Sequence, residues 1–136
     1  MRRLLLLGLL GAAAAAFLAW PRISDVETGR TPEYPDLRER AYAAGEERVG
    51  AAVKKVLGRL PGWTLVGAGS GPSGIAIQAL HTTSLGFKDD VTVRIRREGG
   101  KTRVLVRSRS RVGKLDFGQN ARNIRELLAA LDHELS

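Results

Sequence analysis

The residues of this sequence that could do chemistry are carboxylates and hydroxyls gathered in one stretch. Asp89 and Asp116 flank a run that contains Ser108 and Ser110. Two carboxylates held at different pKa values can act as a general acid and a general base, so Asp89 and Asp116 are the candidates for a hydrolase. Because no nucleophile–base pair accompanies them in the sequence, we favour the alternative, a structural hydrogen-bond network.

Arginine side chains are the second group of residues that could do chemistry. Residues 86–125 contain twelve Lys and Arg against four Asp and Glu, an excess equal to the +8 net charge of the whole chain. Guanidinium groups bind phosphates and carboxylates through paired hydrogen bonds. The sequence therefore predicts a candidate site for an anionic ligand at Arg94, Arg96, Arg103 and Arg107. The alternative is a solvated cationic face that keeps a sheet edge from aggregating.

A β-hairpin is expected to position these arginines. Residues 91–96 and 102–107 alternate between apolar and polar side chains, which is typical of half-buried strands. Gly99 and Gly100 lie between the runs and suit a two-residue turn, since glycine accepts positive φ. The register set by this turn pairs Val93 with Val106, Ile95 with Val104, Arg96 with Arg103 and Arg94 with Leu105. One face of the hairpin is therefore apolar and the other mostly cationic.

The same register places Asp90 opposite Arg109 and Asp89 opposite Ser110. Asp90 and Arg109 are therefore a candidate ion pair on the outer face. Asp89 falls on the inner face, where a buried carboxylate needs hydrogen-bond donors. Two sets of donors are open: the backbone amides of the loop 84–88, which we favour, or the hydroxyls of Ser108 and Ser110.

Two helices are expected around this hairpin. An apolar stripe from Val49 to Leu60 predicts a helix over 41–60, and residues 36–40 are a candidate beginning for it. Asp116 and Gln119 resemble a capping box before a last helix that runs to about Leu135. In that box the Asp116 carboxylate accepts from an early helix amide, and the Gln119 side chain reaches back.

Two short strands precede the hairpin, at residues 63–66 and 75–80. The glycine-rich segment 67–74 between them is predicted to be a flexible connection, because it lacks the sequence context of a phosphate-binding loop. The element order predicts an α+β fold. We expect a two-layer sandwich with a mainly antiparallel four-stranded sheet, two helices on one face and an N-terminal transmembrane helix.

The transmembrane helix is predicted at residues 1–20. Met1-Arg2-Arg3 precedes an apolar run from Leu4 to Trp20, at the short limit for a membrane-spanning helix. The basic start predicts a cytoplasmic amino end, which places the remainder outside the cytoplasm. A signal peptide cleaved near Ala14–Ala16 is the alternative. We expect a single-pass protein of the cell membrane, with a linker at 21–35 and a domain at 36–136.

Composition excludes several kinds of site. The chain has no cysteine, so it holds no disulfide and no thiol nucleophile. His81 and His133 are far apart and form no metal-ligand spacing, and we expect neither a metal nor a cofactor. Since His81 shares strand parity with apolar neighbours, it is predicted to be a hydrogen-bonded histidine at the edge of the core.

Three motifs resemble a bacterial and plastid family known as domain of unknown function 1499 (DUF1499). They are Gly86-Phe87-Lys88-Asp89-Asp90-Val91, Val106-Arg107-Ser108-Arg109-Ser110-Arg111-Val112-Gly113, and Asp116-Phe117-Gly118-Gln119-Asn120. The resemblance covers roughly residues 28–135 and implies no established activity. Many members are similar in having an anchor or export segment. Some carry a Pro-Asn-Cys segment that this chain lacks. The matching residues predict a polar cluster of Asp89, Asp90, Ser108, Arg109, Ser110, Arg111, Asp116 and Asn120.

The combined prediction is a membrane-anchored, non-catalytic binding domain at the cell envelope. Its partner is expected to be an anionic lipid surface or an anionic envelope polymer, because the chain is strongly basic. The alternatives are an enzyme that uses the carboxylate pair, or a nucleic-acid-binding module. We do not favour nucleic acid, since aromatic residues do not interleave with the arginines.

Overall fold

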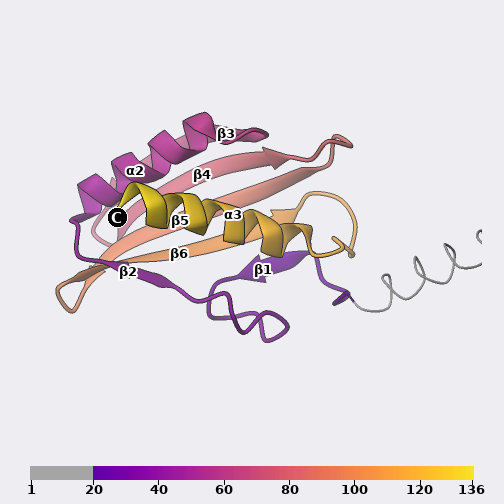
Figure 1. Ribbon diagram of the computed structural model, residues 1–136, viewed down its shortest axis with the longest axis horizontal. Helices are drawn as coiled ribbons and strands as arrows, with labels where there is room; N and C mark the ends of the chain where they lie inside the picture. Colours follow the sequence, from indigo (N-terminus) through magenta and orange to yellow (C-terminus); the bar gives the residue numbers. More distant parts are fainter. Residues whose placement is uncertain (1–19) are drawn as a thin grey trace, which may run out of the picture.

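The computed structural model describes residues 20–136, which form a six-stranded sheet and two helices. In chain order the elements are β1 (Asp25–Glu27), β2 (Arg40–Tyr42), α2 (Glu46–Arg59), β3 (Trp63–Gly71), β4 (Gly74–Thr82), β5 (Lys88–Glu98), β6 (Lys101–Ser110) and α3 (Gln119–Glu134). All strand pairs are antiparallel, in the order β1-β6-β5-β4-β3, and β2 pairs with β6 beside β1. Both helices lie against one face of the sheet, and the other face is open (Figure 1).

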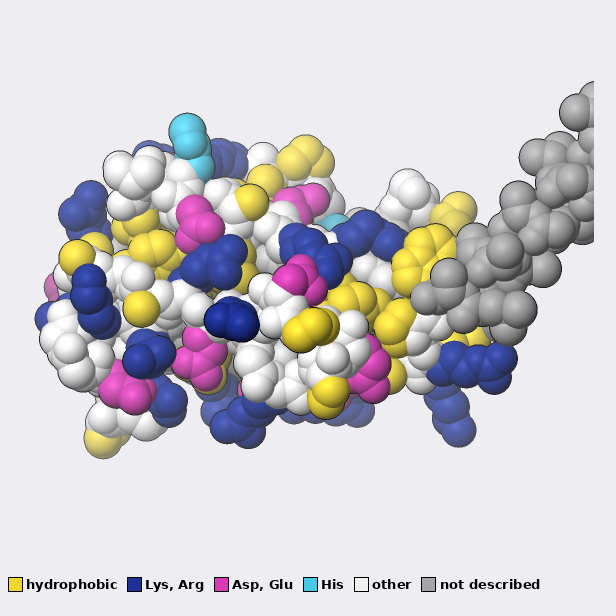
Figure 2. Space-filling view, turned by 60° about the horizontal axis from the view of Figure 1, so that its bottom comes forward, with side chains coloured by type: hydrophobic (Ala, Val, Ile, Leu, Met, Phe, Trp, Pro, Cys, Tyr) yellow, Lys and Arg dark blue, Asp and Glu magenta, His cyan; other side chains and the backbone are white. Residues whose placement is uncertain are grey.

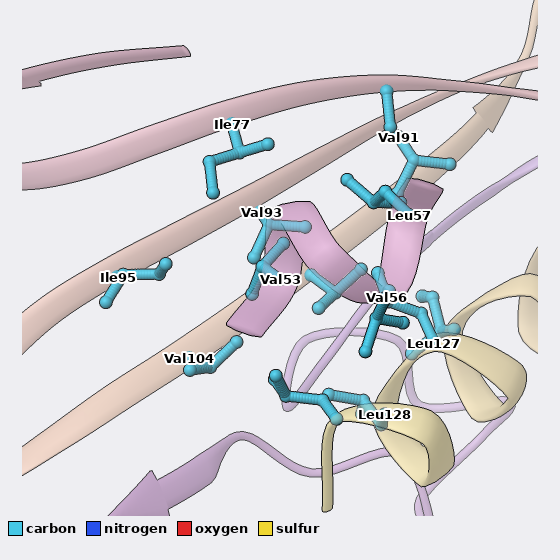
Figure 3. Packing of buried hydrophobic residues seen from close by; sticks show 14 of the residues in the cluster. Val53, Val56, Leu57, Ile77, Val91, Val93, Ile95, Val104, Leu127 and Leu128 are labelled. Carbon is cyan, nitrogen blue, oxygen red and sulfur yellow. The ribbon is translucent and has the colours of Figure 1, made fainter. Parts of the chain in front are cut away.

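Hydrophobic stripes on the helices explain this packing. On α2 the buried residues include Val49, Val53 and Val56, whose spacing places them on one side of the helix. On α3 the corresponding buried stripe is Ile124, Leu127, Leu128 and Leu131, as the sequence predicted. These side chains meet the inward residues of the sheet in one core (Figure 3).

The β5–β6 hairpin confirms the predicted register. Val93 pairs with Val106, Ile95 with Val104, and Arg96 with Arg103. Gly99 and Gly100 form the turn, and both have positive φ, as a two-residue hairpin turn requires. The valines and Ile95 are buried toward the helices, while Arg94 and Arg96 are exposed on the open face.

The predicted number of strands was wrong, because the sheet has six strands instead of four. The two additional strands, β1 and β2, each have three residues and pair with β6. They lie in stretches expected to be a linker and the beginning of a helix. A three-residue edge strand is too short to show alternation, so the tertiary pairing with β6 decides its conformation.

The glycine-rich segment 67–74 is also more regular than predicted. It continues β3 as far as Gly71, and β4 already begins at Gly74, so only Pro72 and Ser73 form the turn. The predicted hairpin connection is therefore confirmed, but it is shorter than predicted. A register shift between Leu65 and Gly67 interrupts the β3–β4 pairing.

The transmembrane helix in the predicted fold is not found. Among residues 20–136, neither helix is long and apolar enough to cross a membrane. Of the predicted span 1–20, only Trp20 is described, and the rest lies outside the described residues. The fold established for the described chain is thus a two-layer domain of six strands and two helices.

Candidate functional site

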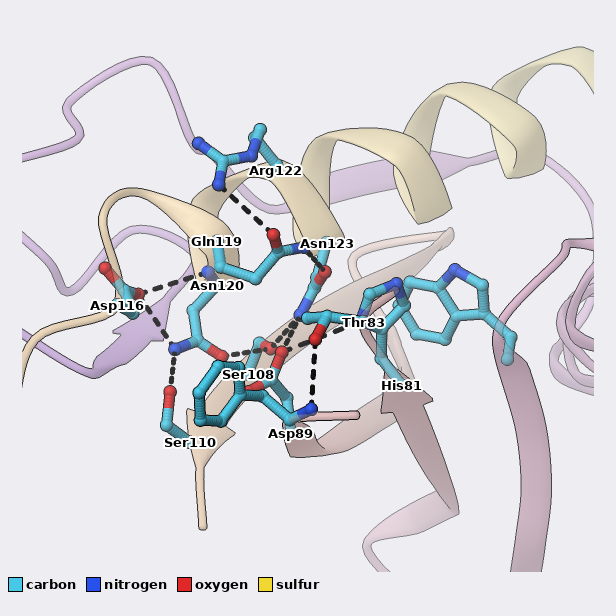
Figure 4. A network of polar contacts seen from close by, with 12 residues as sticks. His81, Thr83, Asp89, Ser108, Ser110, Asp116, Gln119, Asn120, Arg122 and Asn123 are labelled. Carbon is cyan, nitrogen blue, oxygen red and sulfur yellow. Dashed lines mark hydrogen bonds and ion pairs between the residues drawn. The ribbon is translucent and has the colours of Figure 1, made fainter. Parts of the chain in front are cut away.

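A buried polar network lies where α3 begins and crosses the ends of β5 and β6 (Figure 4). The Nδ2 amide of Asn123 donates to Oδ2 of Asp89 at 2.8 Å and to Oγ of Ser108 at 3.1 Å. The Ser108 hydroxyl donates to Oδ1 of Asn120 at 2.7 Å. All four of these side chains are buried, so their hydrogen bonds replace those that water would make.

Asn120 joins this network to the loop before α3. Its Nδ2 amide donates to Oγ of Ser110 at 2.8 Å, to Oδ2 of Asp116 at 2.8 Å and to the carbonyl oxygen of Ser24 at 3.2 Å. Ser24 immediately precedes β1. Asn120 therefore ties the start of the described chain to β6 and α3.

Asp116 accepts from an early amide of the last helix, as the sequence predicted, but the N-cap position is occupied by Gly118 and not by Asp116. Its carboxylate accepts from the backbone amides of Gly118 at 2.8 Å and Asn120 at 3.1 Å. A carboxylate at this position also stabilises the positive end of the helix dipole. The predicted role of Gln119 was wrong, because its side chain donates to Oδ1 of Asn123 at 2.8 Å and does not reach back.

The side-chain donor to Asp89 belongs to neither of the two sets of donors that the sequence left open. This donor is Asn123, a residue that the sequence reasoning missed. The signal that could have found it is spacing: Asn123 lies three residues after Asn120 and four before Leu127, so it shares the buried face of α3. A buried amide at such a position needs partners from the sheet.

His81 is buried beside Asp89, but it is not the hydrogen-bonded histidine that was predicted. Its Nδ1 atom lies 3.6 Å from Oδ2 of Asp89 and has no hydrogen-bond partner in the described chain. The imidazole ring instead packs edge-on against Trp63, with 5.0 Å between ring centroids. The indole of Trp63 donates to Oε1 of Glu126 at 2.6 Å, which links β3 to α3.

The Asp90–Arg109 ion pair was predicted from the correct register but with the wrong partner. Asp90 pairs with Arg109 along the ladder, yet its carboxylate binds the guanidinium of Arg111 at 2.9 Å. This contact raises the pKa of Arg111, because the hydrogen bond to Asp90 favours the charged guanidinium. The pair thus holds the chain that leaves β6 against β5.

The four predicted ligand-binding arginines, Arg94, Arg96, Arg103 and Arg107, all lie on the two central strands β5 and β6. Arg107 makes a two-pronged contact with Asp25 of β1, with N–O distances of 2.9 and 2.5 Å. Arg96 and Arg103 share Glu98, at 3.3 and 3.5 Å. Within residues 20–136, Arg94 alone of the four has no acidic partner.

The ion pair of Arg107 lowers the pKa of the Asp25 carboxyl below its ordinary value of 3.8. The hydrogen bond from Arg107 is the main cause, and burial opposes it. Asp25 is nevertheless partly exposed, with 44% of its side chain accessible. The pair therefore orients Arg107 more than it stabilises the fold.

Three hollows open near these residues. One of about 440 Å³ is lined by Asp90, Thr92, Arg107, Arg109, Ser110 and Arg111. A second, of about 450 Å³, lies between Arg30, Arg94 and Arg96 and the backbone of the β3–β4 hairpin. The third, of about 560 Å³, lies between the β4–β5 loop and the β6–α3 loop, and Asp89 and Asp116 contribute to its lining. The described part of the chain contains no group of three acidic or histidine side chains that could hold a metal ion.

Comparisons with known proteins identify a family without assigning an activity. No curated protein matches the chain. The crystal structure of TTHA0849 from Thermus thermophilus is similar at 16% sequence identity and a TM-score of 0.43, over 82% of this chain and 96% of that one. A family model described as "Protein of unknown function (DUF1499)" matches residues 16–131. Since this match spans most of the sequence, the chain belongs to the DUF1499 family.

Proposed function

We propose that this protein is a non-catalytic binding domain that takes an anionic ligand on the open face of its sheet. The observation that carries the proposal is Arg94, an exposed arginine on a central strand without an acidic partner in the described chain. Its neighbours at the same hollow are Arg30 and Arg96. Three guanidinium groups around one hollow, with Glu27 as the acidic residue of its lining, favour a ligand that carries phosphate or carboxylate groups.

The ion pairs around Arg94 support binding by a prearranged surface. Arg96 and Arg103 are held by Glu98, and Arg107 is held by Asp25. Side chains that are already oriented lose less conformational entropy when a ligand binds. Arg94 is therefore exposed to a ligand on the open face, and the arginines around it are held in place by their ion pairs.

The carboxylates Asp89 and Asp116 favour binding over catalysis in this proposal. Asp116 accepts two backbone amides at the start of α3, and Asp89 accepts from the side chain of Asn123. Such hydrogen bonds are those expected of a structural network that fixes a loop and a helix end. We therefore assign this cluster to the architecture that supports the binding face.

The proposed location is the cell envelope, outside the cytoplasm. It rests on the basic start of the sequence and the apolar run that follows, within residues 1–20. Membrane fractionation with protease protection tests it: the domain should be digested in intact spheroplasts. Protection of the domain until the membrane is lysed would contradict this location.

Calorimetric titration of the full chain in nonionic detergent tests the binding face, with inositol hexakisphosphate as a soluble polyanion. Binding should weaken with added salt and should fall about tenfold in Arg94→Gln, since a hydrogen bond to a charged group contributes about 1.5–3 kcal/mol. Arg48→Gln is the matched control, because it removes an exposed arginine from α2, which packs on the other face of the sheet. Equal losses in both variants would show that only net charge matters and would overturn the assigned face.

A further inference from the structure

Two loops at one end of the domain expose large hydrophobic side chains. The β4–β5 loop and the β6–α3 loop lie at the end where the described chain begins (Figure 1). Leu85 is 83% exposed and Val112 is 78% exposed. The other exposed hydrophobic residues at this end are Phe87, Leu115, Phe117 and Trp20. An exposed apolar cluster of this kind marks an interaction surface.

Local hydrogen bonds hold these side chains outward. In the β4–β5 loop the backbone amide of Thr83 donates to the carbonyl oxygen of Phe87 at 2.8 Å, and the amide of Phe87 donates to the Thr83 hydroxyl at 3.0 Å. Gly86 has φ +86° and closes this turn. Leu85 therefore projects from the tip of a tight turn, so its exposure is built into the loop.

The second loop is fixed in a less common backbone conformation. Phe117 has φ +50°, which non-glycine residues adopt only at a cost of about 1–3 kcal/mol. Its ring packs edge-on against Trp20, with 5.9 Å between centroids. Asp116 and Asn120 anchor the loop from below through the buried network. Strain and network together present the ring at the surface.

Cations surround this apolar end. Lys88 and Arg122 contribute to the hollow between the loops, and Lys114 lies in the second loop. The two acidic residues of the hollow, Asp89 and Asp116, are buried and hydrogen-bonded. Figure 2 shows hydrophobic and cationic side chains close together beside the grey atoms. The exposed charge around this hollow is therefore positive.

We propose that this end of the domain docks on an anionic lipid bilayer, with Leu85, Phe87 and Val112 entering the interfacial layer. Apolar side chains ringed by Lys and Arg match the chemistry of a bilayer surface, where acyl chains lie below anionic phosphates. The position of Trp20 favours this occupant, because the residues before it form the apolar run that begins at Leu4. This surface is separate from the open face around Arg94, so either proposal can fail without the other.

Site-directed fluorescence tests the docking, because the chain has no cysteine of its own. Leu85→Cys and Val112→Cys each receive an environment-sensitive dye in the full chain. Lys101→Cys, in the β5–β6 hairpin at the far end of the domain, is the control. With vesicles of equal parts phosphatidylcholine and phosphatidylglycerol, emission should shift to the blue at residues 85 and 112 and stay unchanged at 101. Unshifted emission at all three positions would overturn the proposal.

A charge series separates lipid docking from other occupants. In the labelled Leu85→Cys chain, Lys88→Gln and Lys114→Gln should each lower the ratio of shifted to unshifted label by roughly fivefold, whereas Lys54→Gln on α2 should not. A shift already present without vesicles, and unchanged by them, would mean that a second copy or the chain's own apolar segment covers the loops, which would overturn the proposal. An equal shift on pure phosphatidylcholine would contradict the role of the cations.

Discussion

Asn120 is the residue on which the buried network depends. Its side chain bonds to Ser108 on β6, to Ser110, to Asp116 and to the backbone of Ser24. Asn120→Ala removes a hydrogen-bond partner from all of these groups at once. This substitution should therefore lower the free energy of unfolding by about 2–4 kcal/mol. Urea unfolding followed by circular dichroism measures the change.

Gln119→Ala is the control for this prediction. It removes a hydrogen bond to Asn123 and an exposed one from Arg122, both at a partly exposed side chain, so its cost should stay near about 1 kcal/mol. A loss in Asn120→Ala as small as that of the control would show that water replaces the missing amide.

The Asp25–Arg107 pair predicts a pH dependence at the edge of the sheet. Because the pKa of Asp25 is lowered in the folded state, its contribution to stability is fully present above the ordinary value of 3.8. That contribution is lost as the pH falls through the folded-state value. The difference in melting temperature between the native chain and Asp25→Asn should therefore be constant near neutral pH and shrink below 3.8. A constant difference down to the acid limit of folding would refute the linkage.

At the scale of elements, the β3–β4 hairpin depends on a glycine that touches the next strand. Gly74 has φ +111°, and a Cβ built there lies only 2.1 Å from the carbonyl oxygen of Ile95. Gly74→Ala should therefore force β4 away from β5 and cost more than about 2 kcal/mol. Thermal unfolding measures the loss.

Gly71→Ala is the matched control across the same turn. A Cβ at Gly71 meets no heavy atom of the described residues within 4 Å, so this change should leave stability within about 1 kcal/mol of the native chain. Similar losses of stability in the two variants would mean that the backbone entropy of the hairpin, and not the contact with Ile95, determines the effect of Gly74→Ala.

The elements that the sequence predicted well are those with long, periodic patterns. The β5–β6 register followed from eleven- and ten-residue strands joined by two glycines. The buried stripe of α3 followed from helical spacing. β1 and β2 were missed because their conformation comes from pairing with β6, and three residues carry no period.

Some members of the buried network were predictable from the sequence, but its hydrogen bonds were less so. Residues Asp89, Ser108, Asp116 and Asn120 do lie together, whereas the partner of Asp90 and the role of Asn123 were not foreseen. A hydrogen bond depends on side-chain reach and angle, which a register alone does not determine. Arg111 also lies just beyond the end of β6, so strand pairing could not predict the position of its side chain.

At the scale of the whole molecule, the two helices and the sheet share one core and should unfold together. Trp63 reports on this, because its indole binds Glu126 of α3 while its ring packs on His81 of β4. In Trp20→Phe, where Trp63 is the only tryptophan, fluorescence and far-ultraviolet circular dichroism should give the same urea midpoint. An earlier fluorescence transition would indicate that α3 detaches before the sheet melts.

The two edges of the sheet differ in length, which limits how copies of this protein can join through strand pairing. β3 offers nine residues without an outer strand partner in the described chain, and its glycines and its register shift weaken that ladder. The opposite side ends in β1 and β2, which offer only three residues each. Backbone pairing of two copies through β3 would leave only these short segments outside. Such self-association would stop at a dimer, so the architecture disfavours growth into a fibre.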